Sequence, residues 1–174
     1  MHDDMTRDDQ MRAPASSPCM AHELPAQALG PDELRGLLNE LLESERAGAR
    51  GLTDLSKATK QPAFAELFRE LAKDEGRFCV MLRQQIIRLG GVPSDRTGAF
   101  YDKLIAREGL VAQLRLLDRG QAAVVSTLTT ALPRVVDAEL HADLQVMLDV
   151  HVRNIDAANQ TAAAWLPGDP ATAE

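Results

Sequence analysis

Two glutamates, an aspartate, a glutamine and a histidine interrupt stretches of sequence that are otherwise apolar on one helical face. They are Glu45, Glu75, Asp118, Gln121 and His151. A carboxylate or an imidazole is costly to bury unless it is paired, hydrogen-bonded or bound to a metal. Carboxylates and imidazoles are also common ligands of Fe(II), Mn(II) and Zn(II). These residues therefore mark a candidate metal site, or the remains of one.

The apolar residues around them recur at steps of three and four, which places them on one face of a helix. Such a face is expected to be buried. The predicted faces are Leu34, Leu38, Leu41, Glu45, Gly48, Leu52 and Leu55; Phe64, Phe68, Leu71, Glu75, Phe78 and Leu82; Val111, Leu114, Asp118, Gln121, Val125, Leu128 and Leu132; and Leu140, Leu144, Met147, His151, Ile155 and Ala158.

Prolines and glycines set the expected boundaries of these helices. Pro31 and Pro62 suit the first turn of a helix, where the missing N–H costs nothing. The first two helices are therefore predicted over residues 31–57 and 62–89. The third ends near residue 132, and the fourth runs from 133–137 to 165. A helical piece at 99–107 precedes the third helix, and whether the two are continuous is left open, with Gly109 as a possible break.

Four helices of about 25 residues, each roughly 37 Å long, suit an antiparallel four-helix bundle. The chain has 174 residues, which fits one domain with two tails. We therefore expect an all-α protein with a disordered tail at 1–30, a bundle at 31–166 and a second tail at 167–174.

The polar residues are predicted to meet at one depth. Glu45 and Glu75 each lie fifteen residues from position 60, the middle of the first turn. Asp118 lies fifteen residues before Pro133 and His151 eighteen after it. Equal distance from a turn means equal depth in a hairpin of antiparallel helices, so one buried polar cluster is expected.

Composition excludes several classes of partner. The net charge is −7 and only 3% of the residues are aromatic, which argues against nucleic acid. No stretch is long and apolar enough to span a bilayer.

The start of the chain does not resemble a signal peptide. A disulfide between Cys19 and Cys79 is not expected, and a cytoplasmic location is predicted.

Several segments resemble the ferritin-like four-helix bundle superfamily, of the rubrerythrin type, and more narrowly a bacterial branch of it without an assigned function. The resemblance covers about residues 33–160. The stretches that carry it are LLNELLESERAGAR, LAKDEGRFCVML, TGAFYDKLIA, LLDRGQAAVV and LQVMLDVHVRNIDAAN.

The resemblance implies a di-iron site, in which two helices each give one Glu and the other two each give a Glu-x-x-His pair. Glu45 and Glu75 match two of these positions, and His151 matches a third. The motif is incomplete, because Phe78 stands where the first histidine is expected and Leu148 where the last glutamate is expected.

This reduced set leaves two hypotheses of different classes. In the first, Glu45, Glu75 and His151 hold a single Fe or Mn ion with water, and Asp118 and Gln121 act as a fourth ligand or support the others. In the second, the bundle is a metal-free structural or interaction module whose polar cluster fixes the helix register. Buried acids would then share a proton or pair with Arg46, Arg50, Arg77 or Arg119. A homodimer is expected under either hypothesis, and no substrate is identified.

Overall fold

The protein is all-helical in a computed structural model that describes residues 27–165. Its elements are α1 (Pro31–Ala58), α2 (Pro62–Arg88), α3 (Phe100–Ile105), α4 (Leu110–Ala131), the 3₁₀ turn η1 (Leu132–Arg134) and α5 (Ala138–Trp165). No strand occurs within residues 27–165. The structure does not describe residues 1–26 and 166–174, which contain most of the predicted tail at 1–30 and all of the predicted tail at 167–174.

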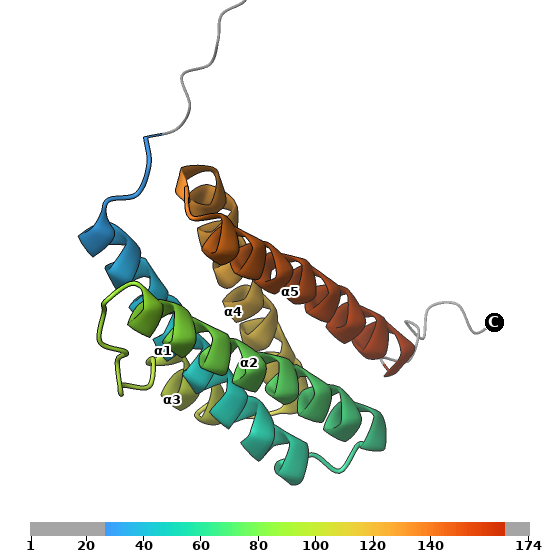
Figure 1. Ribbon diagram of the computed structural model, residues 1–174. Helices are drawn as coiled ribbons and strands as arrows, with labels where there is room; N and C mark the ends of the chain where they lie inside the picture. Colours follow the sequence, from blue (N-terminus) through green and yellow to red (C-terminus); the bar gives the residue numbers. More distant parts are fainter. Residues whose placement is uncertain (1–26, 166–174) are drawn as a thin grey trace, which may run out of the picture.

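The long helices form two consecutive hairpins (Figure 1). A short turn joins α1 to α2, and η1 with residues 135–137 joins α4 to α5. Pro31 and Pro62 open α1 and α2 as the sequence predicted. None of the described helices has the length and apolar character needed to cross a membrane.

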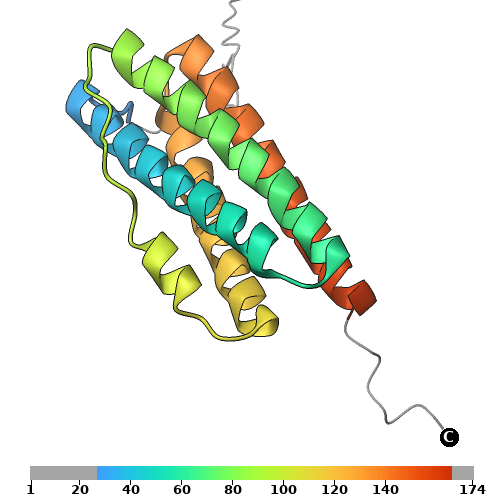
Figure 2. The same cartoon turned by 90° about the horizontal axis from the view of Figure 1, so that it is seen from below.

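The segment between the hairpins contains a separate helix, α3. Residues 89–99 run along the outside of α1, and α3 then lies beside α1 and α4 (Figure 2). Gly109 has a φ of 82°, which L residues rarely adopt, and it separates α3 from α4. The open question of continuity is thus answered: the piece at 99–107 is not part of the long third helix.

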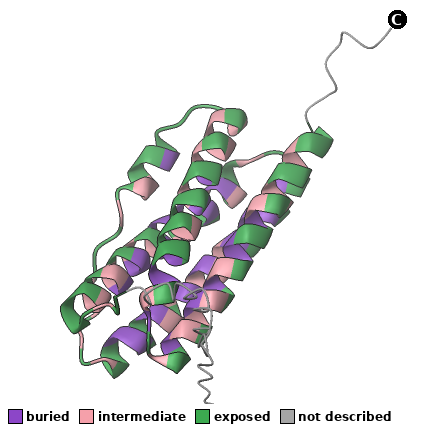
Figure 3. Ribbon diagram, turned by 90° about the horizontal axis from the view of Figure 1, so that it is seen from above, coloured by how far each residue is buried: buried purple, intermediate pink, exposed green. Residues whose placement is uncertain are grey.

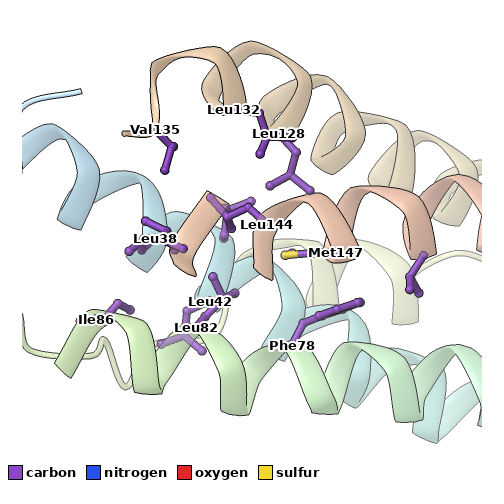
Figure 4. Close-up of a cluster of buried hydrophobic side chains, with 13 residues drawn as sticks. Leu38, Leu42, Phe78, Leu82, Ile86, Leu128, Leu132, Val135, Leu144 and Met147 are labelled. Carbon is purple, nitrogen blue, oxygen red and sulfur yellow. The ribbon is translucent and has the colours of Figure 1, made fainter. Parts of the chain in front are cut away.

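The inward faces of the four long helices are buried and their outward faces are exposed (Figure 3). The buried apolar side chains form two clusters. The first contains Leu38, Leu42, Phe78, Leu128 and Met147, among others (Figure 4). The second, toward the other end of the helices, is built around Leu52, Phe64, Phe68, Leu104 and Leu117.

The chain is already ordered before α1, in residues that the sequence assigned to the tail. The backbone N–H of Leu29 donates to the carbonyl of Arg134 at 2.9 Å, and Arg134 Nε donates to the carbonyl of Gln27 at 2.9 Å. Leu29 also packs against the first apolar cluster. These contacts fasten residues 27–30 to the α4–α5 turn.

Asp137 connects α2 to the start of α5. The Arg88 guanidinium donates to both Asp137 oxygens at 2.6 and 3.0 Å, and the Leu140 N–H donates to Oδ1 at 2.8 Å. The last bond caps α5, because it satisfies an N–H that has no partner inside the helix. The hydrogen bond from Arg88 and then that from Leu140 lower the pKa of Asp137 to about 2.

The variant Asp137→Ala should lower the melting temperature at pH 7, because it loses both the cap of α5 and the link to α2. A depressed pKa stabilises the fold above the ordinary value of 3.8, and this contribution disappears as pH falls through about 2. The difference between wild type and variant should therefore shrink below about pH 4. Thermal unfolding from pH 7 to 2 measures it, with the exposed loop variant Asp95→Ala as control. A difference that does not change with pH would contradict this role of Asp137.

Candidate functional site

Four long helices each place one polar residue in a layer between the two apolar clusters. Glu45 comes from α1, Glu75 from α2, Gln121 from α4 and His151 from α5. Their exposed fractions are 1%, 3%, 5% and 0%. The prediction that polar residues near the middle of four helices would meet is confirmed for these four.

The layer consists of two pairs. His151 Nε2 lies 3.2 Å from Glu45 Oε1, and Gln121 Nε2 donates to Glu75 Oε1 at 2.6 Å. Each pair joins a helix of the first hairpin to a helix of the second. The polar layer therefore links the two hairpins at mid-length.

The backbone of α5 orients the His151 ring. Its Nδ1 lies 3.0 Å from the carbonyl oxygen of Met147. Because a carbonyl can only accept, Nδ1 carries a proton and Nε2 is the nitrogen that faces Glu45. The ring of Phe78, which stands where the ferritin-like pattern has a histidine, packs against this imidazole at 5.5 Å between centroids.

Asp118 does not belong to the layer, so its predicted place on the buried face with the other polar residues is wrong. It is exposed, and the preceding residue, Leu117, points into the second apolar cluster. Neighbouring residues on a helix are about 100° apart, so Leu117 and Gln121 share a face that excludes Asp118. Val111, at the start of the same predicted face, is also exposed.

Among the described residues, no lysine or arginine pairs with either buried glutamate. Arg46 donates to the carbonyl oxygens of Ser94 and Arg96, and Arg50 lies over the ring of Tyr101. Arg77 pairs with Asp74. Arg119, the fourth candidate counter-ion, is exposed. The hypothesis of an arginine-paired acid cluster is therefore wrong for Arg46, Arg50 and Arg77, and His151 is the one potential cation beside these acids in the described core.

Burial and mutual repulsion shift the protonation of the layer. Burial raises the pKa of Glu45, although the nearby His151 opposes the shift. Burial and then the charge of Glu45 hold the pKa of Glu75 well above its usual range. Burial disfavours the charged form of His151, but the Glu45 carboxylate outweighs it and raises the pKa of the imidazole. Burial therefore shifts both acids toward their neutral forms relative to exposed carboxyl groups, and a further cation would oppose this shift.

Four buried polar atoms of this region have no hydrogen-bond partner. They are Glu45 Oε2, Gln121 Oε1, His151 Nε2 and Asn154 Nδ2. The contact between His151 and Glu45 is thus close but not aligned as a hydrogen bond. Unpaired buried polar atoms are uncommon and costly, and an unoccupied ion or ligand position is one explanation for them.

The layer contains three side chains that commonly bind metals, those of Glu45, Glu75 and His151, but they do not converge on one point. Among residues 27–165, no group of three His, Cys, Asp or Glu side chains is close enough to hold an ion together. Glu45 and His151 are adjacent, whereas Glu75 is held by Gln121.

A family model described as a domain of unknown function (DUF6306) matches residues 32–160. The chain belongs to this family. The matched residues include all four residues of the polar layer. No curated protein matches the chain.

The polar layer of this DUF6306 domain is reached from solvent through a pocket of about 280 Å³. Glu45, Glu75 and Gln121 line it, together with Phe100 from α3 and Val124 from α4. The sequence did not reveal this opening, because it depends on where the segment between the hairpins crosses α1.

Asn154 and Cys79 are the other polar or reactive residues near the layer. Asn154 is buried one turn after His151, a position that its spacing of three residues could have indicated. Cys79 is half-buried, and burial raises the pKa of its thiol to about 11. A thiol with that pKa is a poor nucleophile at neutral pH, so Cys79 is best described as an apolar side chain.

Gly48 makes room for Glu75. A Cβ atom at position 48 would lie 1.7 Å from Glu75 Oε2, which no real contact allows. The variant Gly48→Ala should therefore displace Glu75 and destabilise the domain by about 1–3 kcal/mol. On the same helix, Gly36 has nothing within 4 Å of its hypothetical Cβ. Gly36→Ala should accordingly be neutral or stabilise by about 0.4–1 kcal/mol. Urea unfolding of both variants measures this contrast, and equal effects would contradict the close approach at Gly48.

Proposed function

We propose that this DUF6306 domain is an antiparallel four-helix bundle of the ferritin-like type. The order of the elements supports this, because two hairpins of long helices are connected by a segment that runs along the outside of α1. The position of the polar layer also supports it, since each long helix contributes one polar residue near its middle. This is the arrangement in which ferritin-like bundles hold their metals.

We further propose that the polar layer binds one divalent metal ion, Fe or Mn. The observation that carries this proposal is the charge of the core: two glutamates are buried with one histidine and no lysine or arginine. Glu45 Oε2 and His151 Nε2 have no hydrogen-bond partner. A cation between them would satisfy both atoms and would favour the ionised carboxylates.

Glu45 and His151 would be the primary ligands, with Glu75 as the third. Two carboxylates and one imidazole form a ligand set that suits Fe(II) and Mn(II). The Gln121 amide would orient Glu75 through its hydrogen bond, and the Met147 carbonyl would orient the ring of His151. Residues around metal ligands commonly have this role. A bound ion would supply Lewis acidity, and Fe or Mn would add redox chemistry. The two apolar clusters cover the layer on both sides along the bundle, and the pocket leaves it open to solvent at one point.

The second candidate is a metal-free module in which the layer specifies the pairing of the two hairpins. The separation of the layer into two pairs favours it, because no three of the ligand side chains are drawn together. Both candidates retain the homodimer as a prediction from the sequence.

Removing the two primary ligands should abolish metal binding. Protein purified without chelator or nickel affinity chromatography and loaded anaerobically with Fe(II) or Mn(II) should retain about one ion per chain. The double variant Glu45→Ala/His151→Ala should retain none, and Asp118→Ala, which alters an exposed residue, should behave as wild type. Plasma mass spectrometry after desalting measures the content. Metal-free wild type under both loadings would refute the proposal.

Glu75→Gln distinguishes the two candidates. If Glu75 is a ligand, the amide should weaken metal binding by about 10–100-fold and remove the stabilisation that the metal gives. If the module is metal-free, the amide should be tolerated, or should stabilise by about 1 kcal/mol or more, because a buried acid is removed.

The pH dependence of the unfolding free energy provides a second test of the variant Glu75→Gln. An acid with a raised pKa stabilises the fold below its ordinary value of 4.5, and this contribution is lost as pH rises. Metal-free wild type should therefore lose stability as pH rises above about 4.5, and Glu75→Gln should lose less. Urea unfolding with and without Mn(II) across this range records both effects. Identical profiles for the two proteins would show that Glu75 does not titrate in the core.

A further inference from the structure

The pocket that leads to the polar layer has features that a metal ion alone does not use. Its volume of about 280 Å³ leaves space beyond that of a single ion bound by protein side chains. Its apolar lining includes Leu41, Val124 and Phe100. Small-molecule sites typically combine such apolar walls with a few placed polar groups.

Two polar side chains of the pocket have free acceptor positions. Gln121 is 5% exposed; its Nε2 donates to Glu75 Oε1, and its Oε1 has no hydrogen-bond partner. The hydroxyl of Ser44 donates to the carbonyl of Glu40 at 3.0 Å, so its free lone pairs can accept. These two groups favour a ligand that donates hydrogen bonds.

The titratable side chains that line the pocket are all acidic. They are Glu40, Glu45 and Glu75, and the lining contains no lysine, arginine or histidine. Glu40 is exposed, so its carboxylate stands at the solvent side, while the other two lie at the buried end. The Glu40 carboxylate therefore repels anions and attracts cations at the mouth of the pocket.

We propose that the pocket binds a short aliphatic primary ammonium ion. Its N–H groups would donate to Gln121 Oε1 and to neighbouring acceptors, and Glu40 would contribute charge at the mouth. Its alkyl body would lie against Leu41, Val124 and Phe100. The proposal goes beyond metal binding and does not require it, because Gln121 Oε1 lacks a partner whether or not Glu45 and His151 hold an ion.

Three ligands of similar size test the selectivity. Butylammonium, butyrate and 1-butanol are titrated into full-length protein stripped of metal, at constant ionic strength, with binding followed by ¹⁵N NMR and calorimetry. Butylammonium should bind saturably and shift the amides around Gln121 and Val124. Butyrate and 1-butanol should bind at least about tenfold more weakly, because one is repelled and the other lacks the charge.

A matched pair of variants on α4 locates the site. Ala122 and Ala123 are both exposed, but only Ala123 lines the pocket. Ala123→Trp should weaken butylammonium binding by about tenfold or more by filling the mouth, and Ala122→Trp should leave it unchanged. Glu40→Gln should weaken binding by about two- to fivefold, whereas Glu108→Gln, which removes an exposed charge elsewhere, should not.

The two proposals can fail separately. Absence of saturable butylammonium binding, equal binding of 1-butanol, or equal loss in Ala122→Trp and Ala123→Trp would overturn the ammonium site. None of these results bears on metal retention, which is measured by loading with Fe(II) or Mn(II). Conversely, selective butylammonium binding that Ala123→Trp removes would support the pocket even in a protein that retains no metal.

Discussion

The burial of Glu45 and Glu75 opposite a single histidine is the constraint on which the rest of the structure depends. Carboxylates without a matching cation are costly in a core, and their pKa values rise as a result. The surrounding structure is adapted to this cost. Gln121 donates to one acid, His151 approaches the other, and Gly48 leaves the space that Glu75 occupies. A core selected only for stability would place leucines in this layer, and the acids therefore support the proposal of a cation.

The helices around the layer are packed together on both sides of it and leave it open at one point. The two apolar clusters hold the four long helices above and below the polar residues. Between α1 and α4, the pocket reaches the layer from solvent, with Phe100 of α3 in its wall. The segment that connects the hairpins therefore does more than join them, since it shapes the entrance. The acidic side chains of the layer and the pocket would favour both the proposed metal ion and the proposed organic cation.

The helix boundaries and the depth of the two buried glutamates could be predicted from the sequence. Pro31 and Pro62 fixed two helix starts, and equal distances from a turn brought Glu45 and Glu75 to the same depth. The sequence analysis placed Asp118 on the buried face because Leu114, Gln121 and Leu128 are compatible with two neighbouring faces of α4. Only the packing of the folded chain shows that Leu117, and not Asp118, faces the core. The order of residues 27–30 arises from contacts with Arg134, more than one hundred positions away. The pocket depends on the path of the connecting segment, which local periodicity does not encode.

The most direct test of the central claim is anomalous X-ray diffraction at the manganese edge, from crystals of Mn(II)-loaded protein. The account predicts one strong peak between Glu45 Oε2 and His151 Nε2, within about 2.0–2.3 Å of each, with Glu75 turned toward it. A map without a peak in this layer, in which His151 still contacts Glu45 directly and Gln121 still holds Glu75, would contradict the account. The buried acids would then serve the pairing of the helices and not a cation.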